Sequence, residues 1–154
     1  MEPPKILIDN RQKEKVQTQP LLEKTEQILS ALGCSDCEAS IVITDDKEME
    51  DLNKTFRGIS SPTNVLAFPM QEGQFGDISP GLLGDVVISA DTAEKEAQEA
   101  GITLDERMSQ LLIHGILHLK GFDHEQGSEN AMAMEKKSLE LLRLLENNPN
   151  LEAF

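Results

Sequence analysis

The stretch HGILHLKGFDH, residues 114–124, contains every histidine in this chain of 154 residues. The histidines follow the spacing HxxxHxxGxxH, at His114, His118 and His124. Residues four apart on a helix lie one above the other, so His114 and His118 are expected to project from one helix face. Gly121 favours the left-handed conformation that ends a helix, and the chain after it can return His124 to the same point. The spacing therefore predicts three imidazoles around one metal ion.

Three neutral imidazoles with an open fourth position are typical of a catalytic zinc site, in which the pKa of the bound water falls to about 7. We therefore predict one zinc ion per chain. Imidazole also binds nickel and copper, so another divalent metal is an alternative. Histidines that only satisfy hydrogen bonds in the core are a second reading, and the order HxxxHxxGxxH with no histidine elsewhere favours the metal.

The same spacing occurs in the metzincin peptidases, as HExxHxxGxxH, which makes a metallopeptidase-like hydrolase an alternative function. Those enzymes use the glutamate after the first histidine as general base, and this chain has Gly115 there. General base catalysis typically supplies about 10²–10⁴-fold in rate. The glycine therefore favours a different reaction at the same kind of metal site.

Apolar periodicity on either side of the histidines predicts alternating strands and helices. The helix that carries them is apolar nearly all round and is expected to be buried. Two early strands joined by a helix favour a parallel βαβ start, and later strands can complete a mixed sheet. We predict one α+β domain over residues 1–154, with about four strands and about five helices. Strands are expected at 5–9, 39–44, 65–69 and 82–89, and helices at about 20–32, from Asp45 or Asp46 through Met49, Leu52 and Phe56, and at about 92–100, 104–120 and 128–146.

The chain carries 28 acidic and 14 basic residues, a formal net charge of −14. That charge opposes unspecific binding of nucleic acid, so any contact with RNA requires a local basic feature or a partner. No stretch approaches the roughly 20 apolar residues of a membrane span. The first ten residues, MEPPKILIDN, lack the basic patch and apolar core of a signal peptide. We expect a cytoplasmic protein that does not bind membranes.

Cys34 and Cys37 form the one CxxC motif. A structural zinc site needs four ligands, and the sequence offers no second cysteine pair. The motif follows a predicted helix and precedes a strand, the reverse of a thioredoxin motif. We therefore expect two reduced thiols without a role in metal binding or redox chemistry.

Three segments resemble one known family. HGILHLKGFDH resembles the HGxLHLxGyDH signature of the YbeY family, bacterial zinc-dependent endoribonucleases that act in ribosomal RNA maturation and ribosome quality control. LNKTFRGISSPTNVLAFP, residues 52–69, resembles the family's LNxxyRxxdxpTDVLSFp segment, and LLGDVVIS, residues 82–89, resembles its LGDIxIs strand. The similarity thus extends over most of the chain.

This resemblance implies a zincin-like α+β fold, zinc ligands at His114, His118 and His124, and catalytic roles for His114 and Arg57. It implies a single-strand-specific endoribonuclease acting at the 3′ end of 16S ribosomal RNA. Arg57 suits this role physically, because a guanidinium fork can hold a phosphate and stabilise its transition-state charge. Asp123, next to His124, could orient a ligand imidazole.

The implied partners are ribosomal RNA, the ribosome with its basic proteins, and an assembly GTPase. A non-catalytic ribosome-assembly binding module is a further alternative, since an acidic surface favours basic protein partners. Three positions depart from the family pattern: Asn64 replaces an aspartate, Ala67 a serine and Phe122 a tyrosine. Asn64 keeps a hydrogen-bonding side chain but loses a charge. Ala67 lacks a hydroxyl, which is expected to affect packing or a backbone contact, and Phe122 lacks a hydroxyl but retains the ring.

Overall fold

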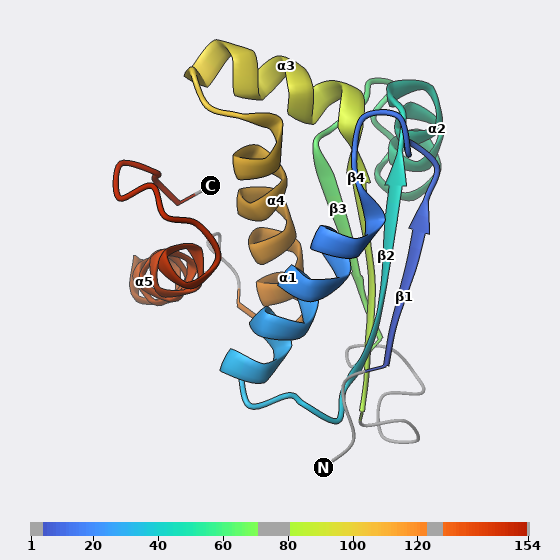
Figure 1. Ribbon diagram of the computed structural model, residues 1–154. Coiled ribbons are helices and arrows are strands. Elements are labelled where there is room, and N and C mark those ends of the chain that lie inside the picture. Colours follow the sequence, from blue (N-terminus) through green and yellow to red (C-terminus); the bar gives the residue numbers. More distant parts are fainter. Residues whose placement is uncertain (1–4, 71–80, 123–127, 154) are drawn as a thin grey trace.

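A four-stranded mixed sheet forms the centre of the molecule in the computed structural model, which describes residues 5–70, 81–122 and 128–153 (Figure 1). The strand order is β1-β2-β4-β3, in which β3 is antiparallel to β4 and the other neighbours are parallel. The predicted parallel start and mixed sheet are confirmed. The strands are β1 (Lys5–Asn10), β2 (Glu38–Thr44), β3 (Val65–Pro69) and β4 (Leu82–Ser89).

Helices cover both faces of this sheet, so the α+β prediction is also confirmed. Asp45 caps one of them: its carboxylate accepts a hydrogen bond from the Glu48 amide at 2.9 Å. The described helices are α1 (Thr18–Ala31), α2 (Asp46–Arg57), α3 (Ala90–Ala100), α4 (Leu104–Leu119) and α5 (Ser128–Leu145).

Alternating side chains along the strands separate the core into two clusters. On β4, Val86 and Ile88 belong to the main cluster, which includes residues of α1, α4 and α5. Val87 faces the other way and packs with Met49 of α2 and with Leu66 of β3. Helices α4 and α2 therefore lie on opposite faces of the sheet (Figure 1).

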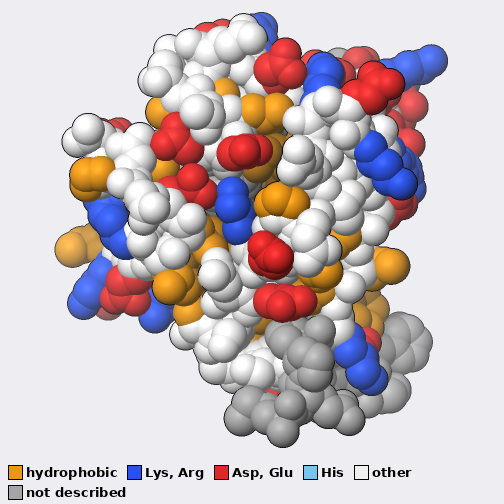
Figure 2. Space-filling model, in the orientation of Figure 1, with side chains coloured by type: hydrophobic (Ala, Val, Ile, Leu, Met, Phe, Trp, Pro, Cys, Tyr) orange, Lys and Arg blue, Asp and Glu red, His pale blue; other side chains and the backbone are white. Residues whose placement is uncertain are grey.

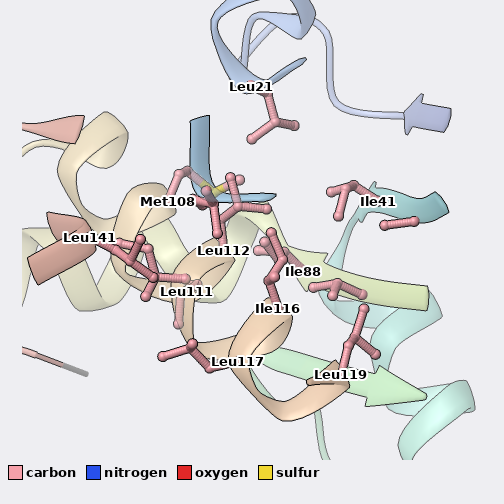
Figure 3. Close-up of a cluster of buried hydrophobic side chains, with 14 of the residues drawn as sticks. Leu21, Ile41, Ile88, Met108, Leu111, Leu112, Ile116, Leu117, Leu119 and Leu141 are labelled. Atoms are coloured by element: carbon pink, nitrogen blue, oxygen red, sulfur yellow. The ribbon is translucent and has the colours of Figure 1, made fainter. Parts of the chain in front are cut away.

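Helix α4 is the most buried of the described helices. Its leucines and isoleucines pack between the sheet on one side and helices α1 and α5 on the other. Figure 3 shows Leu112 and Ile116 of α4 in this cluster, together with Leu141 of α5. Thr103 and Glu106 form a capping box that begins the helix. Gly121, with a φ of 93°, follows its last turn in the left-handed region that the sequence predicts for the helix end.

The interpretation of the CxxC motif as two free thiols is wrong, because Cys34 and Cys37 form a disulfide. The turn between α1 and β2 brings their Cα atoms to 5.2 Å, within the usual bridging range. Lys120, at the end of α4, donates a hydrogen bond from Nζ to Cys34 Sγ at 3.3 Å. The bridged turn is thereby tied to the end of the histidine helix.

Among the helices that the structure describes, none has the length and apolar character needed to cross a membrane.

Candidate metal centre

His114 and His118 face each other on adjacent turns of α4. Their Nε2 atoms are 3.1 Å apart, and their ring centroids are 4.5 Å apart at an interplanar angle of 71°. His114 is buried, with 9% of its surface exposed, and His118 is half-buried. The four-residue spacing thus brings two imidazole nitrogens together at one point, as the sequence predicts.

The separation of these two nitrogens fits a shared metal ion. Tetrahedral zinc with Zn–N bonds of about 2.0–2.1 Å places two ligand nitrogens about 3.3–3.4 Å apart. The observed 3.1 Å between the Nε2 atoms of His114 and His118 is close to that value. The pair therefore has the donor type and the spacing that a zinc site requires.

A third ligand is not found within residues 5–70, 81–122 and 128–153, where no group of three histidine, cysteine, aspartate or glutamate side chains is arranged to hold a metal. His124, the predicted third ligand, and Asp123, its predicted neighbour, lie outside the described residues. His118 is followed by only a short stretch before that segment, and the left-handed Gly121 turns the chain there. The three-histidine metal site thus stays a prediction, of which the structure shows that the first two side chains lie together.

Gly115 faces the sheet at the point where α4 crosses it. A Cβ atom at this position would lie 2.6 Å from Val86 Cγ1 and 3.3 Å from Val65 Cγ2. Real Cβ atoms essentially never approach other atoms as closely as 2.6 Å, so the position has no room for any side chain. The peptidase alternative therefore has no general base at this position.

Arg57 is exposed on the last turn of α2, next to the left-handed Gly58 that ends the helix. The face of β3 that carries Leu66 and Phe68 packs toward α2, whereas Val65 and Ala67 pack into the cluster that contains α4. Within the described residues no hydrogen bond or ion pair joins Arg57 to the histidine pair. The structure brings His114 and His118 together, whereas Arg57 belongs to α2, the helix whose core residues pack on the opposite face of the sheet from α4.

Asn53 shapes the loop that leads from Arg57 into β3. Its side chain is 1% exposed, and its Nδ2 donates to the carbonyl of Ser61 at 2.8 Å. The backbone N–H of Ile59 donates a hydrogen bond to the backbone carbonyl of Asn53 at 3.4 Å. The buried Asn53 side chain therefore holds the loop between α2 and β3 against α2. Sequence reasoning missed this role, although Asn53 lies within residues 52–69, the segment that resembles the YbeY family.

Asn64 begins β3 and contacts a charged network. Its Nδ2 donates to the Glu96 carboxylate at 3.1 and 3.3 Å, and its Oδ1 accepts from the Val65 amide at 2.7 Å. Glu96 also accepts from Arg107 Nη2 at 2.9 Å, and Arg107 Nη1 donates to Gln110 Oε1 at 2.8 Å. An amide donor thus suits this position better than the aspartate of the family pattern, because the neighbour is itself a carboxylate.

The other two departures lie in apolar surroundings. Ala67 and Phe122 are half-buried and pack against the main core cluster. Phe122 also returns toward α4, its amide donating to the Leu117 carbonyl at 3.0 Å. An apolar side chain suits both positions, because a buried hydroxyl there would need a hydrogen-bond partner.

Comparison with known proteins identifies the family of the chain. A family model described as endoribonuclease YbeY matches residues 7–146. A Geobacter sulfurreducens protein named endoribonuclease YbeY is 50% identical over 145 residues, 93% of this chain and 97% of its own length. An Aquifex aeolicus protein of the same name is 50% identical over 129 residues, 84% of this chain and 81% of its own.

A solution structure of a Thermotoga maritima protein is similar in fold, with a TM-score of 0.65 and 26% sequence identity. The alignment covers 97% of this chain and 99% of that one. The similarity therefore includes the sheet together with the helices on both of its faces.

Proposed function

The chain belongs to the YbeY endoribonuclease family, and from this premise we propose that it is a metal-dependent endoribonuclease specific for single-stranded RNA. We propose that it acts in ribosomal RNA maturation at the 16S 3′ end and in ribosome quality control, in the cytoplasm where ribosomes are found. The observation that carries the proposal is the pair of imidazole nitrogens 3.1 Å apart on the buried helix α4.

His114, His118 and His124 would hold the metal, with zinc as the first choice. When bound, zinc supplies a Lewis acid and lowers the pKa of a coordinated water to about 7. The helix holds His114 and His118 rigidly, because the turns that carry them are buried on nearly all sides. Rigid placement matters, since a catalytic group is effective only when held in its productive geometry.

Arg57 would bind the scissile phosphate, its exposed side chain reaching from the end of α2 past the edge strand β3 toward the histidine pair. Its guanidinium has a planar fork of donors that matches two phosphate oxygens, and it stays charged at any physiological pH. It is exposed and belongs to the last turn of α2, so it is available to a ligand. Charge-assisted bonds of this kind become stronger as negative charge develops on the phosphate oxygens.

The test is cleavage of single-stranded RNA by the purified protein, with and without a chelator. Chelation and His118→Ala are expected to abolish cleavage, and added zinc should restore it only in the wild-type protein. Arg57→Ala should reduce kcat/KM by about 10²-fold, the typical cost of losing one transition-state donor. Arg57→Lys should restore only part of it, because lysine lacks the fork.

Lys136→Ala is the matched control, since it removes an exposed cation from α5 instead. It should cleave like the wild-type protein. Cleavage that persists at the same rate in His118→Ala and after chelation would contradict the metal-dependent mechanism, and would indicate a contaminating ribonuclease or another active site.

A ribosome-assembly binding module remains the second candidate, favoured by the net charge of −14. Acidic side chains are spread across the face of the molecule shown in Figure 2, which suits basic ribosomal proteins as partners, or an assembly GTPase with a basic surface. Rescue of a ribosome-processing defect by Arg57→Ala protein that folds and binds zinc would favour docking. Failure to rescue would favour catalysis.

A further inference from the structure

Phe56 is an aromatic side chain that the fold leaves largely in solvent. The sequence pattern places it on the apolar line of α2, yet 62% of its surface is exposed, whereas Met49 on the same helix is fully buried. Its ring meets the ring of Phe68 edge to face, with centroids 5.1 Å apart at 64°. Phe68 thus supports one side of the Phe56 ring, and much of the ring stays open.

The same helix end carries two cations. Lys54 and Arg57 are exposed on the last turn of α2, and neither forms a salt bridge within the described residues. Of the acidic residues of α2, Asp46 and Glu48 lie in the first turn, and the exposed Glu50 and Asp51 lie about one turn before Lys54. In a chain of net charge −14, an exposed aromatic ring next to Arg57 and on the same helix turn as Lys54 is a local feature that suits an anionic ligand with a flat ring.

An edge strand separates this feature from the histidine helix. β3 is the last strand of the sheet, with Phe68 on the α2 face and Ala67 on the α4 face. A flexible single strand can cross such an edge and reach both faces at once. A duplex cannot offer a base to Phe56, because its bases are already stacked on one another.

We propose that Phe56 stacks on an unpaired base of the RNA substrate, with Lys54 and Arg57 at the adjoining phosphates. This inference rests on the proposed function and adds to it a subsite that selects single-stranded RNA. Aromatic stacking of this kind tolerates any base, since every base has a flat face.

The experiment compares two short single-stranded oligonucleotides of equal length and charge, one with all its bases and one abasic, by fluorescence anisotropy. Both carry 2′-O-methyl riboses, which prevents cleavage during the measurement. Wild-type protein should bind the base-bearing strand about 5- to 150-fold more tightly, the range expected for one stacked base. Phe56→Leu should lose most of that preference, because leucine fills the space without offering an aromatic face.

Phe56→Tyr and Leu144→Ala are the control variants. Tyrosine retains the ring, and Leu144 is an exposed apolar residue on α5, so both variants should keep the wild-type preference. With cleavable RNA, Phe56→Leu should raise KM and leave kcat nearly unchanged, as expected when only binding is lost. Urea unfolding of Phe56→Leu shows whether α2 still packs on the sheet.

Two results separate this inference from the proposed function. If the wild-type protein cleaves RNA, but Phe56→Leu prefers the base-bearing strand over the abasic strand as strongly as wild type does, the stacking subsite alone is overturned. A protein that neither binds nor cleaves single-stranded RNA overturns the proposed function and the subsite together. Loss of preference in Phe56→Leu with recovery in Phe56→Tyr supports the subsite.

Discussion

Gly115 shows how one residue controls the distance between the histidine helix and the sheet. Alanine is the better helix former by about 1 kcal/mol, so Gly115→Ala would stabilise an isolated helix. In this fold the added Cβ would lie 2.6 Å from Val86 Cγ1. We therefore expect Gly115→Ala to lower the free energy of unfolding by about 1–3 kcal/mol, the usual cost of overpacking a core. Urea denaturation measures this change.

A double-mutant cycle with Val86→Ala identifies the cause. Removing the valine methyl groups opens the space that the alanine at position 115 needs, so the double variant should be more stable than the sum of the two single changes indicates. A coupling of about 0.5–3 kcal/mol is typical of residues in contact. Strict additivity would mean that the contact between Gly115 and Val86 does not limit the packing.

Asn64 makes a second prediction at the residue scale, because its amide donates to Glu96. Asn64→Asp removes the donor and places two carboxylates together, which raises the pKa of one of them. We expect a loss of about 1–2 kcal/mol at pH 7, the cost of an unmet polar contact. The loss should shrink as the pH falls toward 4, since a protonated carboxyl can donate again. Unfolding at several pH values measures it.

The control for this change uses the Glu96→Gln background. A neutral amide at position 96 no longer repels the new carboxylate, so Asn64→Asp should cost less there at pH 7. An equal cost in both backgrounds would show that the Glu96 charge is not responsible.

At the scale of the element, the start of α4 depends on one carboxylate. Hydrogen bonds from the Thr103 backbone N–H and then from the Asn148 side chain lower the pKa of Glu106. A lowered pKa in the folded state means that the stabilisation is present above the unfolded value near 4.5 and is lost as the pH falls through the folded value. Glu106→Gln should therefore destabilise the protein at pH 7, by up to about 1 kcal/mol, and less at pH values below the folded pKa.

Chemical denaturation of both proteins across this pH range tests the prediction. Glu135→Gln, which removes an exposed carboxylate from α5, is the control. A difference between Glu106→Gln and wild type that stays constant down to the lowest pH would show that the charge of Glu106 does not stabilise the helix start.

The sequence predicted the strands and helices better than it predicted the contacts between them. The strands at 65–69 and 82–89 match prediction because alternation and flanking turns are local signals, and the histidine pair follows from helical spacing alone. The side of the sheet on which α2 packs depends on tertiary structure, and so does the exposure of Phe56. The contact between Asn64 and Glu96 joins residues 32 apart, a pairing that no local pattern encodes.

At the scale of the whole molecule, the net negative charge opposes the binding of RNA at the proposed site. A net charge of −14 repels RNA at long range, and the fold compensates only locally, with cations such as Lys54 and Arg57 at the end of α2. For the proposed function, affinity for RNA should therefore come from short-range contacts, namely the proposed stacking, phosphate fork and metal. This arrangement favours a few strong contacts over a broad basic surface, and it keeps unspecific binding low.

Binding of the proposed metal should stabilise the whole fold, since His114 and His118, its two proposed ligands within the described residues, belong to the central helix α4. A ligand that binds only the native state raises the free energy of unfolding by about 2.7 kcal/mol at a hundred times its Kd. We expect zinc to raise the thermal midpoint of the wild-type protein, and a chelator to reverse the shift. His118→Ala should show little of this response, whereas Lys136→Ala should respond fully. Differential scanning calorimetry over a zinc titration measures the shift, and an equal shift in His118→Ala would show that zinc binds elsewhere than at the helix α4 pair.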